Sequence, residues 1–247
     1  MSPLVSVELY ERYGAALGAA SDIAEAAIKK CVGMSAPELE TAYVAIVTRL
    51  AGVTAEVARE FYEAQRQLEQ DLEGYEPQAY AKADEPLLLY DARTNAAAAL
   101  AGMAQQRIME SADYTIMQNL ARDPATPRWA LVPHAGACSW CQLIGSNGFR
   151  YRSESTAGAS RHPHCRCSLV VDFDTDNPHL AGYDDSELFK RYANARSKAK
   201  SQAEVDWAAM PEADKAAFEA ATPNGRGAYD RFLRNRIVAQ MRADQIK

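Results

Sequence analysis

With 247 residues, the chain is long enough for one large domain or two small ones with a buried core. Its hydrophobic content of 48% and charged content of 24% are ordinary for a soluble protein and argue against global disorder. The net charge of −6 is uneven, because residues 1–124 carry 10 Lys and Arg against 19 Asp and Glu. Such an acidic first half argues against wholesale wrapping of nucleic acid, which depends on neutralising phosphates.

The sequence shows no sign of membrane insertion or secretion. No apolar run approaches the roughly 20 residues that a membrane-spanning helix needs, so we expect no membrane contact. The first residues lack a basic region followed by an apolar core, which predicts no secretory signal. We therefore expect a cytosolic protein, in which paired cysteines more often bind a metal than form disulfides.

Residues 1–124 are predicted to be helical. Apolar side chains recur at three- and four-residue steps over 7–33, 36–73 and 94–122, and Pro86 predicts a turn into a further short helix. The Ala-rich composition predicts a bundle or hairpin of closely packed helices. The apolar stripe predicted for the first helix consists of Leu9, Tyr13, Leu17, Ala20, Ile23, Ala27 and Ile28.

Residues 125–183 have the pattern of a small antiparallel β module. Apolar or alternating runs at 128–132, 149–152 and 168–173 predict three short strands, and the Gly-rich stretch 145–148 predicts a hairpin turn before the second.

Residues 184–247 are predicted to return to helix. The expected segments lie near 186–203, after Pro211 and around 228–244, with Asp184 and Asp185 as capping residues. Together the three regions predict an α+β protein, mainly helical, with a small β module in its second half.

The most distinctive stretch of the sequence is 134–172, which holds four of the five cysteines and three of the four histidines. A Cys-x-x-Cys pair can present two thiolates to one ion, and tetrahedral zinc takes four Cys or His ligands. We expect zinc, because such an ion would stabilise a small module with few apolar residues. The first choice of ligands is Cys138, Cys141, His162 and Cys165, with Cys167 and then His164 as substitutes.

Three other interpretations of the cysteines stay open. Two disulfides would hold the same strands together, and reduced thiols could simply pack in a small core. A cysteine nucleophile would need an orienting acid, and none is placed nearby in the sequence. We therefore expect no catalytic residue in this stretch.

Arginines accompany the cysteines and could form a basic patch. Together with Tyr151 and Phe149 they would suit phosphate or an acidic surface, although exposed strand residues of any sheet would give the same pattern. The patch would consist of Arg150, Arg152, Arg161 and Arg166. Cys31 and His179 are expected to be a buried small side chain and a loop residue, respectively.

The order of these motifs resembles the minor head proteins of tailed phages of the phage Mu F type, in their actinobacterial branch. The resemblance covers roughly residues 90–172 and is most specific in His162-Pro163-x-Cys165-Arg166-Cys167. It also includes Trp129, Val132-Pro133, the pair Cys138 and Cys141, and the Gly-rich turn.

The resemblance implies a non-enzymatic virion protein inside the capsid, associated with the portal and other head proteins. Such proteins act in head assembly and, in some members, in DNA packaging or ejection, which makes DNA a further candidate partner. It implies host cytoplasm during assembly and no small-molecule substrate. The alternative from the residues alone is a zinc-ribbon-like nucleic-acid-binding protein, and a thiol enzyme is the third class.

Overall fold

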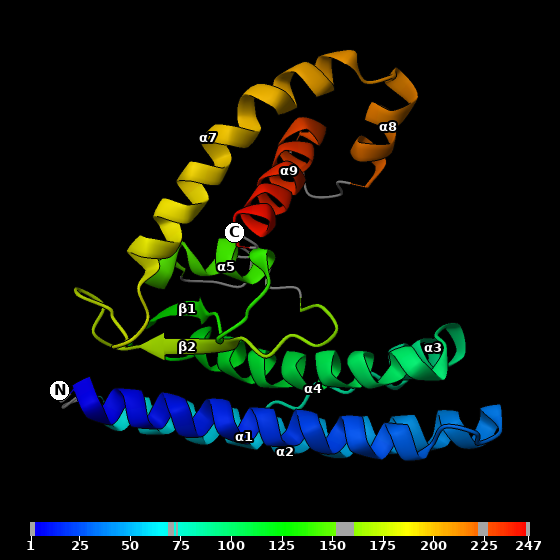
Figure 1. Cartoon of the computed structure of the whole chain (residues 1–247). Coiled ribbons are helices and arrows are strands. Elements are labelled where there is room, and N and C mark those ends of the chain that lie inside the picture. Colours follow the sequence, from blue (N-terminus) through cyan, green and yellow to red (C-terminus); the bar gives the residue numbers. More distant parts are fainter. Residues whose placement is uncertain (1–2, 69–71, 73, 152–160, 222–226, 246–247) are drawn as a thin grey trace. The chain divides into compact units, whose positions relative to one another are not determined.

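The computed structural model describes residues 3–68, 72, 74–151, 161–221 and 227–245. Helices dominate this part of the chain and one two-stranded antiparallel sheet accompanies them in the second half, so the predicted α+β class is confirmed (Figure 1). In chain order the elements are α1 (Pro3–Lys30), α2 (Ala36–Leu68), α3 (Glu85–Thr94), α4 (Ala97–Leu120), β1 (Arg128–Val132), α5 (Ser139–Gly145), the 3-10 helix η1 (Gly148–Arg150), β2 (Ser168–Asp172), α7 (Asp185–Ala209), α8 (Glu212–Ala220) and α9 (Ala228–Gln245).

The chain forms two compact units. The first comprises Met1–Ala135 and Gly148–Tyr183, and the second comprises Gly136–Asn147 and Asp184–Lys247. The predicted division at residues 124 and 183 stays a prediction.

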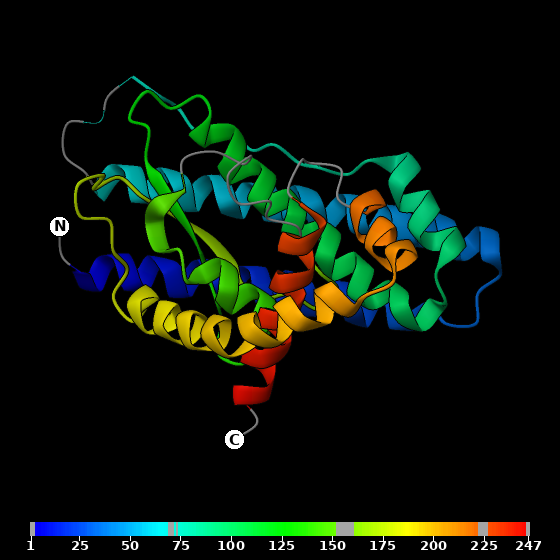
Figure 2. The same cartoon turned by 90° about the horizontal axis from the view of Figure 1, so that it is seen from above.

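The core of the first unit is the contact of α2 with both α1 and α4, three long helices that lie side by side (Figures 1 and 2). Alanines such as Ala51 and Ala58 are completely buried in it and allow the helix backbones to approach closely. Larger side chains fill the remaining space, and the rings of Tyr13 and Phe61 stack with centroids 4.2 Å apart. The predicted helices at 7–33 and 94–122 are thus present with slightly different ends.

One residue of the predicted stripe of α1 is misplaced. Ile23 is 58% exposed, whereas the neighbouring Ala24 is fully buried. The buried stripe passes through Ala20, Ala24 and Ile28 because those positions are four residues apart and share one helix face. The sequence analysis assigned the larger apolar residue, Ile23, to the buried face, but the smaller Ala24 is the residue that packs there.

Helix α2 begins at Ala36 as predicted and is described to Leu68; most of the predicted continuation to residue 73 lies outside the described residues. By length and composition alone, α2 is long and apolar enough to cross a membrane. Its buried face packs on α1 and α4, however, and a core helix passes the same test. Its other face carries an ion-paired Arg59 between Glu56 and Glu63.

Between α2 and α3 the extended segment 75–82 lies along α4 and is held by side chains of that helix. Asn119 accepts from the Gln78 amide (2.9 Å) and donates to its carbonyl oxygen (2.8 Å). Thr115 accepts from the Tyr80 amide (3.0 Å) and donates to its carbonyl (3.1 Å), and Ser111 accepts from the Lys82 amide (3.0 Å). We call these contacts the α4 ladder.

The sheet pairs β1 with β2 in antiparallel register, Trp129 opposite Val171 and Leu131 opposite Leu169. All residues of β2 are buried, and the strand packs against α2 and α4. Two of the three predicted strands are therefore confirmed. The strand predicted at 149–152 is wrong for the residues described: η1 takes its place, and Tyr151 makes only an isolated bridge to Trp129.

The predicted hairpin turn at 145–148 is also wrong, because these residues end α5 and lead into η1. Aromatic packing explains why residues 149–151 alternate between aromatic and basic side chains without forming a strand. Phe149 makes an edge contact with Tyr183 at 6.0 Å, and Tyr151 stacks on Trp129 at 4.5 Å.

The second unit consists of α5 with α7, α8 and α9. Asp184 caps α7 as predicted, with its carboxylate accepting from the Glu187 amide at 2.9 Å. Helices α7 and α9 lie side by side (Figure 1) around a small apolar core. The buried residues of that core are Ala195, Ala199, Ala203, Phe232, Leu233, Ile237 and Met241.

Candidate metal centre

The predicted zinc ligands occur in two groups, one in each unit of the chain. In the second unit, Cys138 is exposed and occupies the N-cap position of α5, where its sulfur accepts from the Cys141 amide at 3.5 Å. Cys141 is buried in the first turn. The helix start thus places both thiols of the Cys-x-x-Cys motif at one end of a short helix.

In the first unit, His162, Cys165 and Cys167 lie on the loop that leads into β2. Pro163 and His164 form a turn, with His164 at φ 63° and the Cys165 amide donating to the His162 carbonyl at 3.1 Å. Cys165 and Cys167 are 2% and 1% exposed, whereas Arg166 between them is exposed. Burial therefore alternates along these three residues as it would in a strand, although they precede β2.

Arg161 is the best-anchored residue of this loop. It is buried and forms a two-pronged ion pair with Asp113 of α4, with both N–O distances at 2.5 Å. A third nitrogen donates to the Cys165 sulfur at 3.4 Å and to the Cys167 carbonyl. Burial raises the pKa of Asp113 and the guanidinium opposes that shift. Burial alone would lower the pKa of Arg161, but Asp113 and then Cys165 raise it.

His164 connects the same loop to α1 and α4. Its Nδ1 lies 2.8 Å from the Gln105 side-chain oxygen, and Gln105 donates in turn to Glu25 at 3.0 Å. The imidazole lies directly against Gly102, because a Cβ at that position would come within 2.6 Å of Nε2. A glycine in the middle of a helix, costly by about 1 kcal/mol relative to alanine, thus provides the space for this ring.

The four arginines proposed as a basic patch do not share one exposed surface among the residues described. Arg161 is buried against Asp113, which corrects its assignment to a surface patch. Arg166 is partly exposed and pairs with Asp22 of α1 at 2.5 Å, while Arg150 is exposed in η1. Arg152 lies outside the described residues. The structural role of Arg161 follows from its desolvation, since a buried guanidinium needs a carboxylate partner.

The helix residues that hold the loop were not predicted from the sequence. Asp113, Gln105 and Gly102 are separated from the loop by about fifty or more residues, and their spacing in α4 is that of any helix. The one available signal is Gly102 within an otherwise Ala-rich helical run, a position that often has a packing reason.

The donor types fit a soft metal ion. Each unit offers such donors: the thiols of Cys138 and Cys141 in the second unit, and His162 with the thiols of Cys165 and Cys167 in the first. The N–H of Arg161 on the Cys165 sulfur is the kind of outer contact that orients a thiolate ligand. Of the residues expected to have no role here, Cys31 is buried and donates to the Ala27 carbonyl, and His179 is an exposed loop residue.

Comparison with known protein families places the chain among phage-associated viral proteins. Residues 8–195 match the family described as VG15 protein, and the chain belongs to this family. No curated protein and no solved structure matches it. The phage origin expected from the sequence is thereby supported; the narrower resemblance to the phage Mu F type is not shown by this match.

Proposed function

We propose that the protein is a non-enzymatic minor capsid protein that binds the portal inside the phage head and acts in head assembly, of the kind that the sequence resemblance implies. Membership of the VG15 family over residues 8–195 is the observation that carries the proposal, since it makes this a phage protein. The protein would be present in host cytoplasm during assembly and inside the capsid afterwards, with DNA packaging or ejection as further roles.

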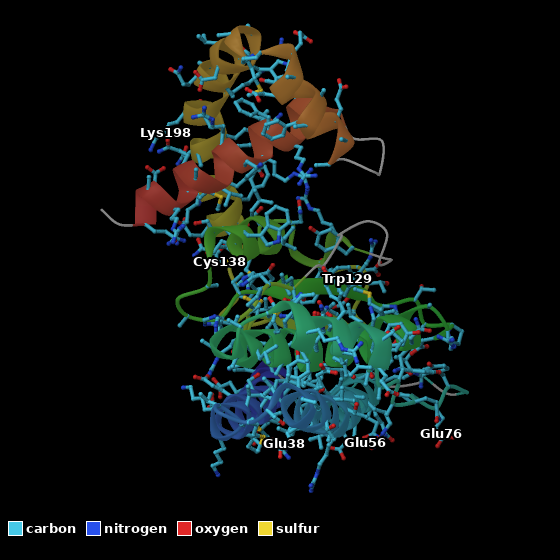
Figure 3. All side chains as sticks on the ribbon, turned by 90° about the vertical axis from the view of Figure 1, so that its right-hand side faces the viewer. Glu38, Glu56, Glu76, Trp129, Cys138 and Lys198 are labelled. Atoms are coloured by element: carbon cyan, nitrogen blue, oxygen red, sulfur yellow. The ribbon has the colours of Figure 1, made fainter. Side chains whose placement is uncertain are left out.

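The first unit suits protein recognition. Its three long helices form a continuous core, so that exposed faces are held rigidly and little conformational entropy is lost on docking. The sequence of this unit carries 15 Lys and Arg against 23 Asp and Glu, so the unit is acidic. Two of these acidic residues, Glu38 and Glu56 of α2, lie on the outer side of the bundle (Figure 3). A basic surface on the portal or a head protein would complement this unit.

Virions and mutant phages provide the direct test. Mass spectrometry of purified virions should detect the protein in few copies, and it should co-purify with the portal protein of the same phage when the two are co-expressed. Deletion of the gene should reduce the yield of filled heads in electron micrographs. Absence from virions together with normal plaque formation by the deletion phage would refute the proposal.

We also propose that four of the five residues Cys138, Cys141, His162, Cys165 and Cys167 bind a zinc ion. Buried thiols, an imidazole and the arginine contact to Cys165 support it. When bound, zinc would cross-link parts of the polypeptide and would not take part in a reaction. Elemental analysis of freshly reduced protein should find about one zinc per chain. Protein that has not been reduced distinguishes the disulfide alternative, because disulfide-bonded cysteines would hold no metal and would react as thiols only after reduction.

The nucleic-acid-binding alternative has less support from the placement of the arginines, because Arg161 is buried and Arg166 is paired with Asp22. The full chain should bind duplex DNA weakly, since its net charge is −6. Nanomolar binding with a steep dependence on salt would reverse this preference.

A further inference from the structure

The loop that carries Cys165 and Cys167 is fixed to the helical bundle by side chains outside the set of five zinc ligands proposed above. Arg161 pairs with Asp113, His164 lies against Gly102 and contacts Gln105, and these contacts all reach α4. Both anchoring residues precede the two buried cysteines along the loop.

We propose that Arg161 and His164 are positioning residues, which hold Cys165 and Cys167 at their places on the α1–α4 bundle before a metal binds. The proposal rests on the zinc site proposed above and assigns a further role to residues outside the ligand set. Gly102 and Asp113 of α4 are the corresponding residues on the helix side.

The strength of the two contacts differs, and the structure indicates why. The ion pair of Arg161 with Asp113 is buried and consists of two parallel N–H to oxygen contacts. Arg161 also donates to the Cys165 sulfur and to the Cys167 carbonyl. His164 is largely exposed but is fixed at Nδ1 by Gln105 and limited by the helix surface at Gly102.

Anchoring of this kind lowers the cost of binding a metal. A loop that is ordered only when the ion arrives must lose backbone and side-chain freedom at that moment, and this loss weakens the affinity. A loop already held by Arg161 and His164 has lost that freedom on folding. Outer-shell contacts to metal ligands change affinity by roughly 10- to 100-fold when they are removed.

Gly102→Ala tests the proposal without changing any of the five residues of the proposed ligand set. The added Cβ would lie 2.6 Å from Nε2 of His164, so the ring must leave its place and lose Gln105. Gly52→Ala is the matched control, because it is also a helical glycine and has nothing within 4 Å of the added Cβ. Arg161→Ala is the stronger variant, but it can prevent folding. Circular dichroism should show that Gly102→Ala and Gly52→Ala both keep the helical fold.

Two measurements separate positioning from metal binding. In reduced, chelator-treated protein, alkylation of Cys165 and Cys167, followed by peptide mass spectrometry, should become about tenfold faster in Gly102→Ala and stay unchanged in Gly52→Ala. Zinc affinity, measured by competition with a chromophoric chelator, should fall by at least about tenfold in Gly102→Ala only.

The outcomes distinguish the two proposals. Equal alkylation rates in Gly102→Ala and wild type would overturn the positioning role, whether or not zinc binds. Faster alkylation with unchanged zinc affinity would also overturn it, because the loop would then be held without any consequence for the metal. A wild-type protein that binds no zinc refutes the zinc proposal and, with it, the role in metal binding, even where alkylation shows that the loop is anchored.

Discussion

Arg161 shows how one side chain can connect parts of the sequence that lie far apart. It is buried, and its partner Asp113 comes from α4, 48 residues earlier in the chain. Two charges removed from water are tolerated because each satisfies the other with good geometry. Either partner left alone would be an uncompensated charge in the interior.

Asp113→Ala is therefore expected to lower the free energy of unfolding by about 3–5 kcal/mol. Urea unfolding followed by circular dichroism measures this change. Arg166→Ala provides the control, because its pair with Asp22 is partly exposed and should contribute about 1 kcal/mol or less. A loss at Asp113 no larger than at Arg166 would contradict a structural role for the buried pair.

The sequence could not identify this pair. Arg161 stands among three other arginines near the cysteines, and residue type alone assigned all four to a surface. The distinction between Arg161 and Arg166 depends on which side chain the loop turns toward the bundle. That direction is set by the turn at Pro163 and His164 and by distant residues of α4.

At the scale of elements, the α4 ladder explains why residues 75–82 are ordered without forming a strand. Asn119 is fully buried and uses its amide oxygen for the Tyr75 hydroxyl and the Gln78 amide, and its amide nitrogen for the Gln78 and Thr115 carbonyls. Each of these partners would otherwise need another group to satisfy it.

Asn119→Ala should consequently lower the free energy of unfolding by about 2 kcal/mol or more, because the backbone groups of Gln78 lose their partners. Chemical denaturation measures the effect. Gln106→Ala on the same helix is the control, since its contact with Glu110 is a partly buried local one and should be worth about 0.5 kcal/mol or less. Equal losses for both variants would show that the ladder does not hold the segment.

Most helices were predictable because their apolar period is regular, as in α2. Two strands were predictable because each contains a short run of apolar residues, as in β2. The error at 145–151 has a local cause. Helix α5 has only seven residues and a cysteine as its N-cap, so it lacks both the length and the usual capping residue that indicate a helix. Glycines at its end then resembled a hairpin turn, and aromatic residues that pack on Tyr183 and Trp129 resembled a strand.

For the whole molecule, buried phenols limit stability at high pH. Burial raises the pKa of Tyr75 to about 12, and the pKa values of Tyr13, Tyr43 and Tyr62 are raised as well, first by burial. In the unfolded chain these groups ionise near pH 10. Their contribution to stability is therefore complete below about pH 10 and is lost as the pH rises above it.

Alkaline titration should show helix loss and tyrosinate absorbance rising together, because the buried phenols ionise mainly when the fold opens. Tyr43→Phe should move this transition to higher pH, since it removes one such group. Tyr90→Phe, at a residue that is 62% exposed, should leave it in place. Tyrosinate absorbance that rises fully while the helical signal is intact would contradict the prediction.

The α4 ladder also depends on a match between the spacing of residues along a helix and the spacing along an extended chain. Four residues of helix advance by about 6 Å and two residues of extended chain by nearly 7 Å, so Ser111, Thr115 and Asn119 face Lys82, Tyr80 and Gln78 in turn. Only every second amide of the segment receives an acceptor from these three side chains. Hydrogen exchange along 78–82 should therefore alternate between slow and fast from one residue to the next, as at the edge of a sheet, although the neighbouring element is a helix.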